Sequence, residues 1–120
     1  MKIGTDIVQI CRIKESIDRF GDKFLYRFLN ENEILLSNKT ESYAGYWAAK
    51  EAISKALGCG IGKELSFKDI TILKNQKGVP YFQLSKEKQK TFNIATSSLS
   101  ISHDGGFAIA VVAIILKDNI

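Results

Sequence analysis

Four polar side chains stand out because each lies among apolar residues or on one face of a predicted helix: Asp6, Glu51, Lys55 and His103. Two carboxylates can hold a divalent cation, while a lysine and a histidine can neutralise the phosphate oxygens that complete its coordination shell. Together, the four residue types predict a magnesium and phosphate site. Each residue also has a purely structural explanation, and residue type alone does not decide between that explanation and the metal and phosphate site.

The structural explanations differ from residue to residue. Glu51 and Lys55 are four positions apart, a spacing typical of a surface ion pair on a helix, which contributes about 0.3 to 0.5 kcal/mol. A carboxylate at Asp6 needs a cation or hydrogen bonds to offset its desolvation, and a salt bridge to Arg12 would also serve. His103 can bind phosphate as an imidazolium or pack as a neutral ring.

The composition predicts a folded, soluble protein. The chain has 120 residues, of which 45% are hydrophobic and 25% charged, and it shows no linker or repeat, so we expect one domain over residues 1–120. Its longest apolar run, Phe107 to Leu116, is about half of the roughly 20 residues that a membrane-spanning helix needs. We therefore interpret this run as a buried strand and expect no association with a membrane.

Charge and cysteine content bound the partners and the compartment. Seventeen basic and thirteen acidic residues give a net charge of +4, which favours an acidic partner but is dispersed along the chain, so we expect no nucleic acid. Cys11 and Cys59 lack metal-ligand spacing, and the N-terminus carries no secretory signal, which predicts free thiols in a reducing cytoplasm.

Hydrophobic periodicity predicts the elements that carry these side chains. Asp6 lies in an opening strand, Lys2 to Ile10, and an amphipathic helix broken near Gly21 follows from Arg12. The remaining predicted elements are a helix that Asn30 caps with Glu33 and that ends around Ser37 to Lys39, two strands around a turn at Asn75 to Gly78, a short helix capped by Ser85, and a hairpin about Gly105-Gly106.

The longest predicted helix carries Lys50, Glu51 and Lys55; it is capped by Thr40 and ends at Gly58. A row of alanines at four-residue spacing, Ala44 to Ala56, predicts close packing against another element. The following segment, GCGIG (58–62), either places backbone N–H groups near a phosphate or only ends the helix.

Several blocks resemble the holo-[acyl carrier protein] synthase family, in the order in which that family carries them. They are GTDIV with a following RI, WAAKEAISKALGCGIG, KGVPY, and SISH before a strongly apolar strand. The resemblance implies a 4'-phosphopantetheinyl transferase, which moves phosphopantetheine from coenzyme A to a serine of apo-acyl carrier protein, releases 3',5'-ADP and supports fatty acid biosynthesis. It also implies an α+β fold, with helices packed on an antiparallel sheet, and a homotrimer with active sites between subunits.

The resemblance also implies a role for individual residues. Asp6 and Glu51 match the family's Mg²⁺ ligands, Lys55 matches a lysine near the coenzyme A pyrophosphate, and these three are the predicted catalytic residues. His103 matches a histidine at the coenzyme A site, and Gly60 is a further predicted coenzyme A contact. The group that accepts the serine proton stays open between a metal-bound water or hydroxide and Glu33, and Lys50 remains a structural or peripheral charge.

Members of this family dock acyl carrier protein on the first helix. Arg12 is the best match to a docking residue, and Lys14, Arg19 and Lys23 are predicted to add electrostatic steering together with Arg27. Acidic neighbours reduce the excess between Arg12 and Arg27 to +2, so an ordinary solvated helix face remains an alternative.

Two departures from the family pattern bear on substrate affinity. Tyr46 stands where many relatives carry arginine, and Asp104-Gly105-Gly106 predicts a shorter and more flexible turn after His103. Two competing functions are a small basic binding module without chemistry, for which the dispersed charge argues poorly, and a degenerate transferase that binds without turnover. Intact Asp6, Glu51 and Lys55 argue against the degenerate transferase.

Overall fold

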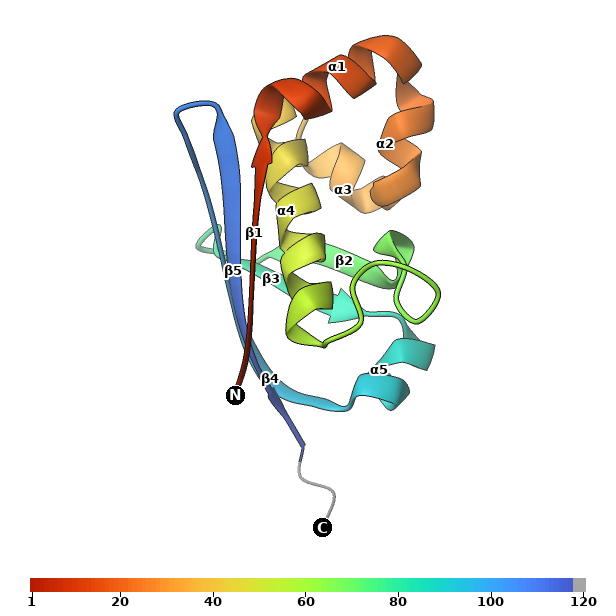
Figure 1. Ribbon diagram of the computed structural model, residues 1–120, viewed down its shortest axis with the longest axis vertical. Helices are drawn as coiled ribbons and strands as arrows, with labels where there is room; N and C mark the ends of the chain where they lie inside the picture. Colours follow the sequence, from red (N-terminus) through yellow and green to blue (C-terminus); the bar gives the residue numbers. More distant parts are fainter. Residues whose placement is uncertain (118–120) are drawn as a thin grey trace.

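Two antiparallel sheets and a long helix that contacts both make up the fold (Figure 1). The computed structural model describes residues 1–117. The elements in chain order are β1 (Lys2–Gln9), α1 (Ile10–Phe20), α2 (Asp22–Phe28), α3 (Glu31–Leu36), α4 (Thr40–Ala56), the 3-10 turn η1 (Phe67–Asp69), β2 (Ile70–Lys74), β3 (Pro80–Leu84), α5 (Lys86–Phe92), β4 (Ile94–Asp104) and β5 (Phe107–Leu116). The predicted α+β class is confirmed.

The larger sheet has the strand order β1-β5-β4, with every neighbouring pair antiparallel. On the face toward α4, β5 buries every second residue from Ala108 to Ile114, while Ile109, Val111 and Ile115 of the opposite face are exposed. The prediction of a buried strand is therefore correct for one face only. The second face of β5 is an apolar surface on the single chain.

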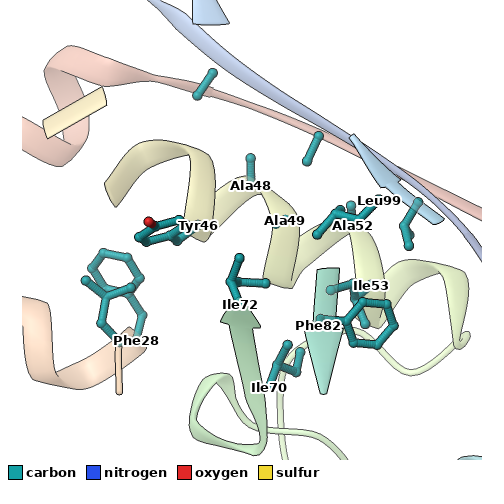
Figure 2. Close-up of a cluster of buried hydrophobic side chains, with 14 of the residues drawn as sticks. Phe28, Tyr46, Ala48, Ala49, Ala52, Ile53, Ile70, Ile72, Phe82 and Leu99 are labelled. Carbon is teal, nitrogen blue, oxygen red and sulfur yellow. The ribbon is translucent and has the colours of Figure 1, made fainter. Parts of the chain in front are cut away.

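The alanine row predicted for α4 forms the centre of the core, where Ala44, Ala48 and Ala52 are fully buried. Figure 2 shows Ile72 and Phe82 on one side of the helix and Leu99 on the other. The row packs closely against β1, where a Cβ added to Gly4 would lie only 1.9 Å from the carbonyl oxygen of Ala52. Small residues on both elements thus bring the β1 backbone against the α4 backbone.

Several predicted boundaries are confirmed and two are wrong in detail. Gly21 separates α1 from α2, and Asn30 and Glu33 form the predicted capping box of α3. Thr40 begins α4 rather than capping it, since Lys39 has the extended N-cap backbone. Ser85 stands at the N-cap of α5 but makes no side-chain cap hydrogen bond; its hydroxyl donates to Asp69 Oδ1 at 3.0 Å instead.

Both cysteines, Cys11 and Cys59, are free thiols as predicted. None of the helices within residues 1–117 is both long enough and apolar enough to cross a membrane.

Candidate active site

Asp6, Glu51 and Lys55 come together at one surface cavity of about 410 Å³. Asp6 lies on β1, on the same face as Gly4 two residues before it, so the close approach of β1 to α4 brings its carboxylate to the helix that carries Glu51 and Lys55. The cavity is lined by Asp6, Ile7, Val8, Arg12, Ile13, Ser16, Phe24, Trp47, Glu51 and Lys55. The structure thus assembles the three predicted catalytic residues.

Lys55 pairs with Asp6 rather than with its helix neighbour Glu51. Its ammonium donates to Asp6 Oδ1 at 2.9 Å and to the carbonyl oxygen of Thr5 at 3.2 Å. The Lys55 side chain is 52% exposed and that of Asp6 only 15%, so the pair sits at the edge of the cavity. The salt-bridge partner of Asp6 is therefore Lys55 and not Arg12, although Arg12 lines the same cavity.

The surroundings of Glu51 in the cavity disfavour its ionised form. Burial raises the pKa of Glu51 and the nearby Asp6 carboxylate raises it further, while Lys55 opposes both effects. Two carboxylates that repel each other in a partly buried site are an oxygen donor set of the kind that Mg²⁺ accepts. Among residues 1–117, no group of three or more histidine, cysteine, aspartate or glutamate side chains converges, so water and substrate oxygens would supply the rest of the shell.

An aromatic wall, formed by Phe24 and Trp47 on the cavity and by Phe28 and Phe67 behind them, closes one side of the site. The rings of Phe24 and Trp47 stack with their centroids 6.0 Å apart. The ring centroids of Phe28 and Phe67 lie 5.1 Å and 4.7 Å from that of Trp47. Sequence reasoning missed this wall, although Trp47 precedes Glu51 by four residues and therefore shares its helix face.

His103 lies elsewhere on the single chain. It is exposed on β4 and lines a second cavity of about 190 Å³, which does not include Asp6, Glu51 or Lys55. Lys74, at the end of β2, lines the same cavity and adds a cation that sequence reasoning missed, because Lys74 and His103 are brought to one cavity only by the fold.

The GCGIG segment follows the end of α4, and the N–H groups of its Gly58, Cys59, Gly60 and Gly62 all donate within the chain. The N–H groups of Cys59 and Gly60 both donate to the carbonyl oxygen of Ser54 at 3.2 Å, and Gly58 donates to Lys55 at 3.0 Å. Gly58 and Gly60 have positive φ angles of 83° and 65°, as a helix C-terminus requires. This geometry supports the structural explanation for the segment, and a coenzyme A contact at Gly60 stays a prediction.

Lys50 and Glu33 form a fully buried ion pair, with Nζ 2.8 Å from Oε1 and neither side chain exposed. Lys50 is thus a structural charge and not a peripheral one. Glu33 does not line the cavity, and its carboxylate accepts hydrogen bonds from Lys50 and from the backbone of Asn30 and Ile72. This burial argues against the alternative of Glu33 as the proton acceptor, because its carboxylate does not face the cavity.

The predicted docking residues Arg12, Lys14, Arg19 and Lys23 are all exposed on α1 and α2. Lys14 is partly neutralised by an ion pair with Asp18 at 2.9 Å. A third cavity, of about 290 Å³, is lined by basic and aromatic residues of this region: Phe20, Lys23, Phe24 and Arg27. Because Phe24 also lines the first cavity, the basic surface adjoins the site that holds Asp6 and Glu51.

The two departures noted in the sequence have different structural outcomes. Gly105 and Gly106 have φ angles of 58° and 86° and form a tight turn, whose Gly106 carbonyl accepts a hydrogen bond from Ile10 at 2.9 Å. The turn is thus hydrogen-bonded to the start of α1, and its predicted flexibility stays a prediction. Tyr46 is 2% exposed, and within the described part of the chain its hydroxyl has no hydrogen-bond partner.

A sequence model of the 4'-phosphopantetheinyl transferase superfamily matches residues 2–112. A relative from a Sulfurovum species, named holo-[acyl-carrier-protein] synthase, is 61% identical over 114 residues, which are 95% of this chain and 96% of the relative.

Two solved structures extend the similarity to the fold. The Helicobacter pylori holo-[acyl-carrier-protein] synthase in complex with coenzyme A is 58% identical with a TM-score of 0.91, over 94% of this chain and 99% of that one. The Bacillus anthracis holo-(acyl-carrier-protein) synthase in complex with CoA (3',5'-ADP) is 40% identical with a TM-score of 0.81, over 97% and 96% of the two chains.

Proposed function

Because this chain belongs to the 4'-phosphopantetheinyl transferase superfamily, we propose that it transfers 4'-phosphopantetheine from coenzyme A to a serine of apo-acyl carrier protein and releases 3',5'-ADP. The observation that carries the proposal is the convergence of Asp6, Glu51 and Lys55 on one cavity. The reaction supplies holo-acyl carrier protein to fatty acid biosynthesis, and we place it in the cytoplasm. A basic module without chemistry would not need a partly buried Glu51 whose pKa is raised by burial and by the nearby Asp6 carboxylate.

Magnesium is the proposed cofactor, with Asp6 and Glu51 as its protein ligands. The raised pKa of Glu51 supports this assignment, because a divalent cation would relieve the repulsion between the two carboxylates. When bound, Mg²⁺ supplies charge stabilisation for the pyrophosphate of coenzyme A and for the departing 3',5'-ADP.

The protein itself orients the reactants. Lys55 reaches the cavity from its half-exposed position and can donate to a phosphate oxygen, which stabilises charge on the leaving group. Arg12 lines the same cavity and extends it toward the basic surface of α1 and α2. Since Glu33 is buried in its pair with Lys50, we assign the serine proton to solvent in the cavity as the serine attacks the β-phosphate in line.

We propose a homotrimer in which each active site lies between two subunits. Support comes from the apolar sheet face opposite α4, where Ile3 is 62% exposed, Ile7 is 59% exposed and Ile109 and Val111 lie beside them. Such a surface is costly in water and typical of a subunit interface. The separation of the His103 cavity from the Asp6 cavity also supports it, because coenzyme A would contact Asp6 of one subunit and His103 of its neighbour.

Acyl carrier protein is the proposed macromolecular partner, bound on the exposed basic residues Arg12, Lys14, Arg19 and Lys23. An acidic carrier would be steered to this surface and placed next to the cavity that α1 and α2 border. Neutralisation of Lys14 by Asp18 makes Arg12, at the cavity itself, the strongest single contact.

Intact-mass spectrometry of apo-acyl carrier protein tests the function directly. We expect a phosphopantetheine adduct after incubation with this protein, coenzyme A and Mg²⁺, and none when EDTA replaces the metal. A competent carrier that stays unmodified under both conditions would favour the degenerate transferase. Sedimentation tests the trimer separately, and a fully active monomer would contradict it.

A further inference from the structure

The buried pair of Lys50 and Glu33 lies directly behind the candidate active site. Lys50 precedes Glu51 on α4, yet its side chain is fully buried in the core whereas Glu51 lines the cavity. Burial lowers the pKa of Lys50, and the Glu33 carboxylate opposes that effect. None of the catalytic steps proposed above uses either group, so the position of this pair calls for an explanation.

Every polar atom of the pair has a partner. The Lys50 ammonium donates to the carbonyl oxygen of Phe28 at 2.7 Å, to Glu33 Oε1 at 2.8 Å and to the carbonyl oxygen of Phe67 at 3.1 Å, which satisfies its three N–H groups. Glu33 accepts the backbone N–H of Asn30 and that of Ile72, each at 2.6 Å. One ion pair thus joins the end of α2, the start of α3, α4, η1 and β2.

The same contacts support the aromatic wall of the cavity. Phe28 and Phe67, whose carbonyl oxygens accept from Lys50, are two of the three residues whose rings pack on Trp47. Phe24, one turn before Phe28 on α2, contacts the rings of both Phe28 and Trp47. The backbone that Lys50 holds therefore carries the rings that shape one side of the Asp6 cavity.

We propose that Lys50 and Glu33 are positioning residues for the transfer reaction: they hold α2 and the aromatic wall in one arrangement against α4. Apolar packing alone tolerates repacking, whereas separating a buried ion pair leaves two charges without partners. Because α1 and α2 also carry the basic docking surface, the pair aligns the bound carrier with the coenzyme A that Glu51 and Lys55 hold. This inference rests on the proposed function.

The test replaces both charges together, because removing one would leave the other buried and uncompensated. In Glu33→Leu/Lys50→Met we expect kcat at saturating coenzyme A and carrier to fall by about tenfold or more, through lost alignment. The Kd for coenzyme A, measured by calorimetry, should stay within about twofold, since Glu51 and Lys55 are unchanged. Trp47 is the only tryptophan, so acrylamide quenching of its fluorescence should increase as the wall loosens.

Leu84→Ala is the matched control for lost stability. Leu84 is buried on β3 and lines neither the Asp6 cavity nor the aromatic wall, so its truncation should destabilise the fold while kcat and Trp47 quenching stay at wild-type values. An equal loss of kcat in Leu84→Ala would overturn the positioning role, because stability alone would then explain the result. Unchanged kcat in the double variant would overturn it as well.

Phe24→Ala decides the question if the double variant does not fold. It removes part of the wall and leaves the charge pair intact, so we expect the same loss of kcat at saturating coenzyme A. Wild-type kcat in Phe24→Ala would refute the proposal. A wild-type chain that modifies no carrier would instead refute the proposed function, while the fluorescence comparison would still report on the wall.

Discussion

Gly4→Ala is expected to damage both the fold and the site, because Gly4 allows β1 to lie against α4. The added Cβ would lie 1.9 Å from the carbonyl oxygen of Ala52, 2.9 Å from its carbonyl carbon and 2.9 Å from the nitrogen of Ala56. All three atoms belong to the helix backbone, so no side chain can rotate away. Real Cβ atoms essentially never approach closer than 3.0 Å, which requires β1 and α4 to separate by at least about 1.1 Å.

The expected magnitude follows from this displacement. Overpacking of a tight contact costs about 1 to 3 kcal/mol in the free energy of unfolding. Asp6 lies two residues from Gly4 on the same face of β1, so its carboxylate would move by a similar distance from Glu51 and Lys55. A misplacement of about 1 Å in a catalytic group can lower the rate by about 100-fold.

The assay pairs urea unfolding with the rate of phosphopantetheine transfer at saturating Mg²⁺. Gly62→Ala is the matched control, because a Cβ there meets no heavy atom within 4 Å and its N–H keeps the hydrogen bond to Leu65. This control should keep the wild-type rate. Its free energy of unfolding should rise by at most about 1 kcal/mol, because alanine lowers the conformational entropy of the unfolded chain. Wild-type stability and rate in Gly4→Ala, or equal losses in both variants, would refute the assigned contact.

Three further predictions test other parts of the site. Asp6→Asn and Glu51→Gln should each abolish Mg²⁺-dependent transfer while circular dichroism shows a normal fold; wild-type rates would remove both residues from the metal site. The raised pKa of Glu51 means that its carboxyl keeps its proton in the folded state at pH values above 4.5, where the unfolded chain has lost it. The stability that this proton contributes is therefore lost as pH rises through the folded-state pKa. The pH dependence of the urea midpoint should lose this contribution in Glu51→Gln, and identical profiles for variant and wild type would contradict the prediction. Tyr46→Phe removes a buried hydroxyl that has no partner within residues 1–117, and should raise the free energy of unfolding by about 1 kcal/mol; destabilisation would indicate a missing contact for that hydroxyl.

Local pattern was sufficient for most elements of the fold. Alternating β-branched residues marked β1, helical periodicity interrupted at Gly21 marked α1 and α2, and the Asn30 capping box marked the start of α3. These signals depend on contacts between residues near in sequence, which is why they could be predicted from it. The errors at Thr40 and Ser85 concern single capping hydrogen bonds, and Ser85 instead donates to Asp69, a partner that pattern does not specify.

For the candidate site as well, some features could be predicted from the sequence and others are set only by the tertiary structure. The sequence by itself predicted Asp6, Glu51 and Lys55 as the site residues, because their types and the motifs that carry them are read along the chain. Only the tertiary structure decided that Lys55 pairs with Asp6, that Lys50 and Glu33 are buried together, and that His103 lies at a different cavity. Each of these joins elements distant in sequence, and their relative placement depends on core packing, such as the contact between Gly4 and α4, that no local pattern encodes.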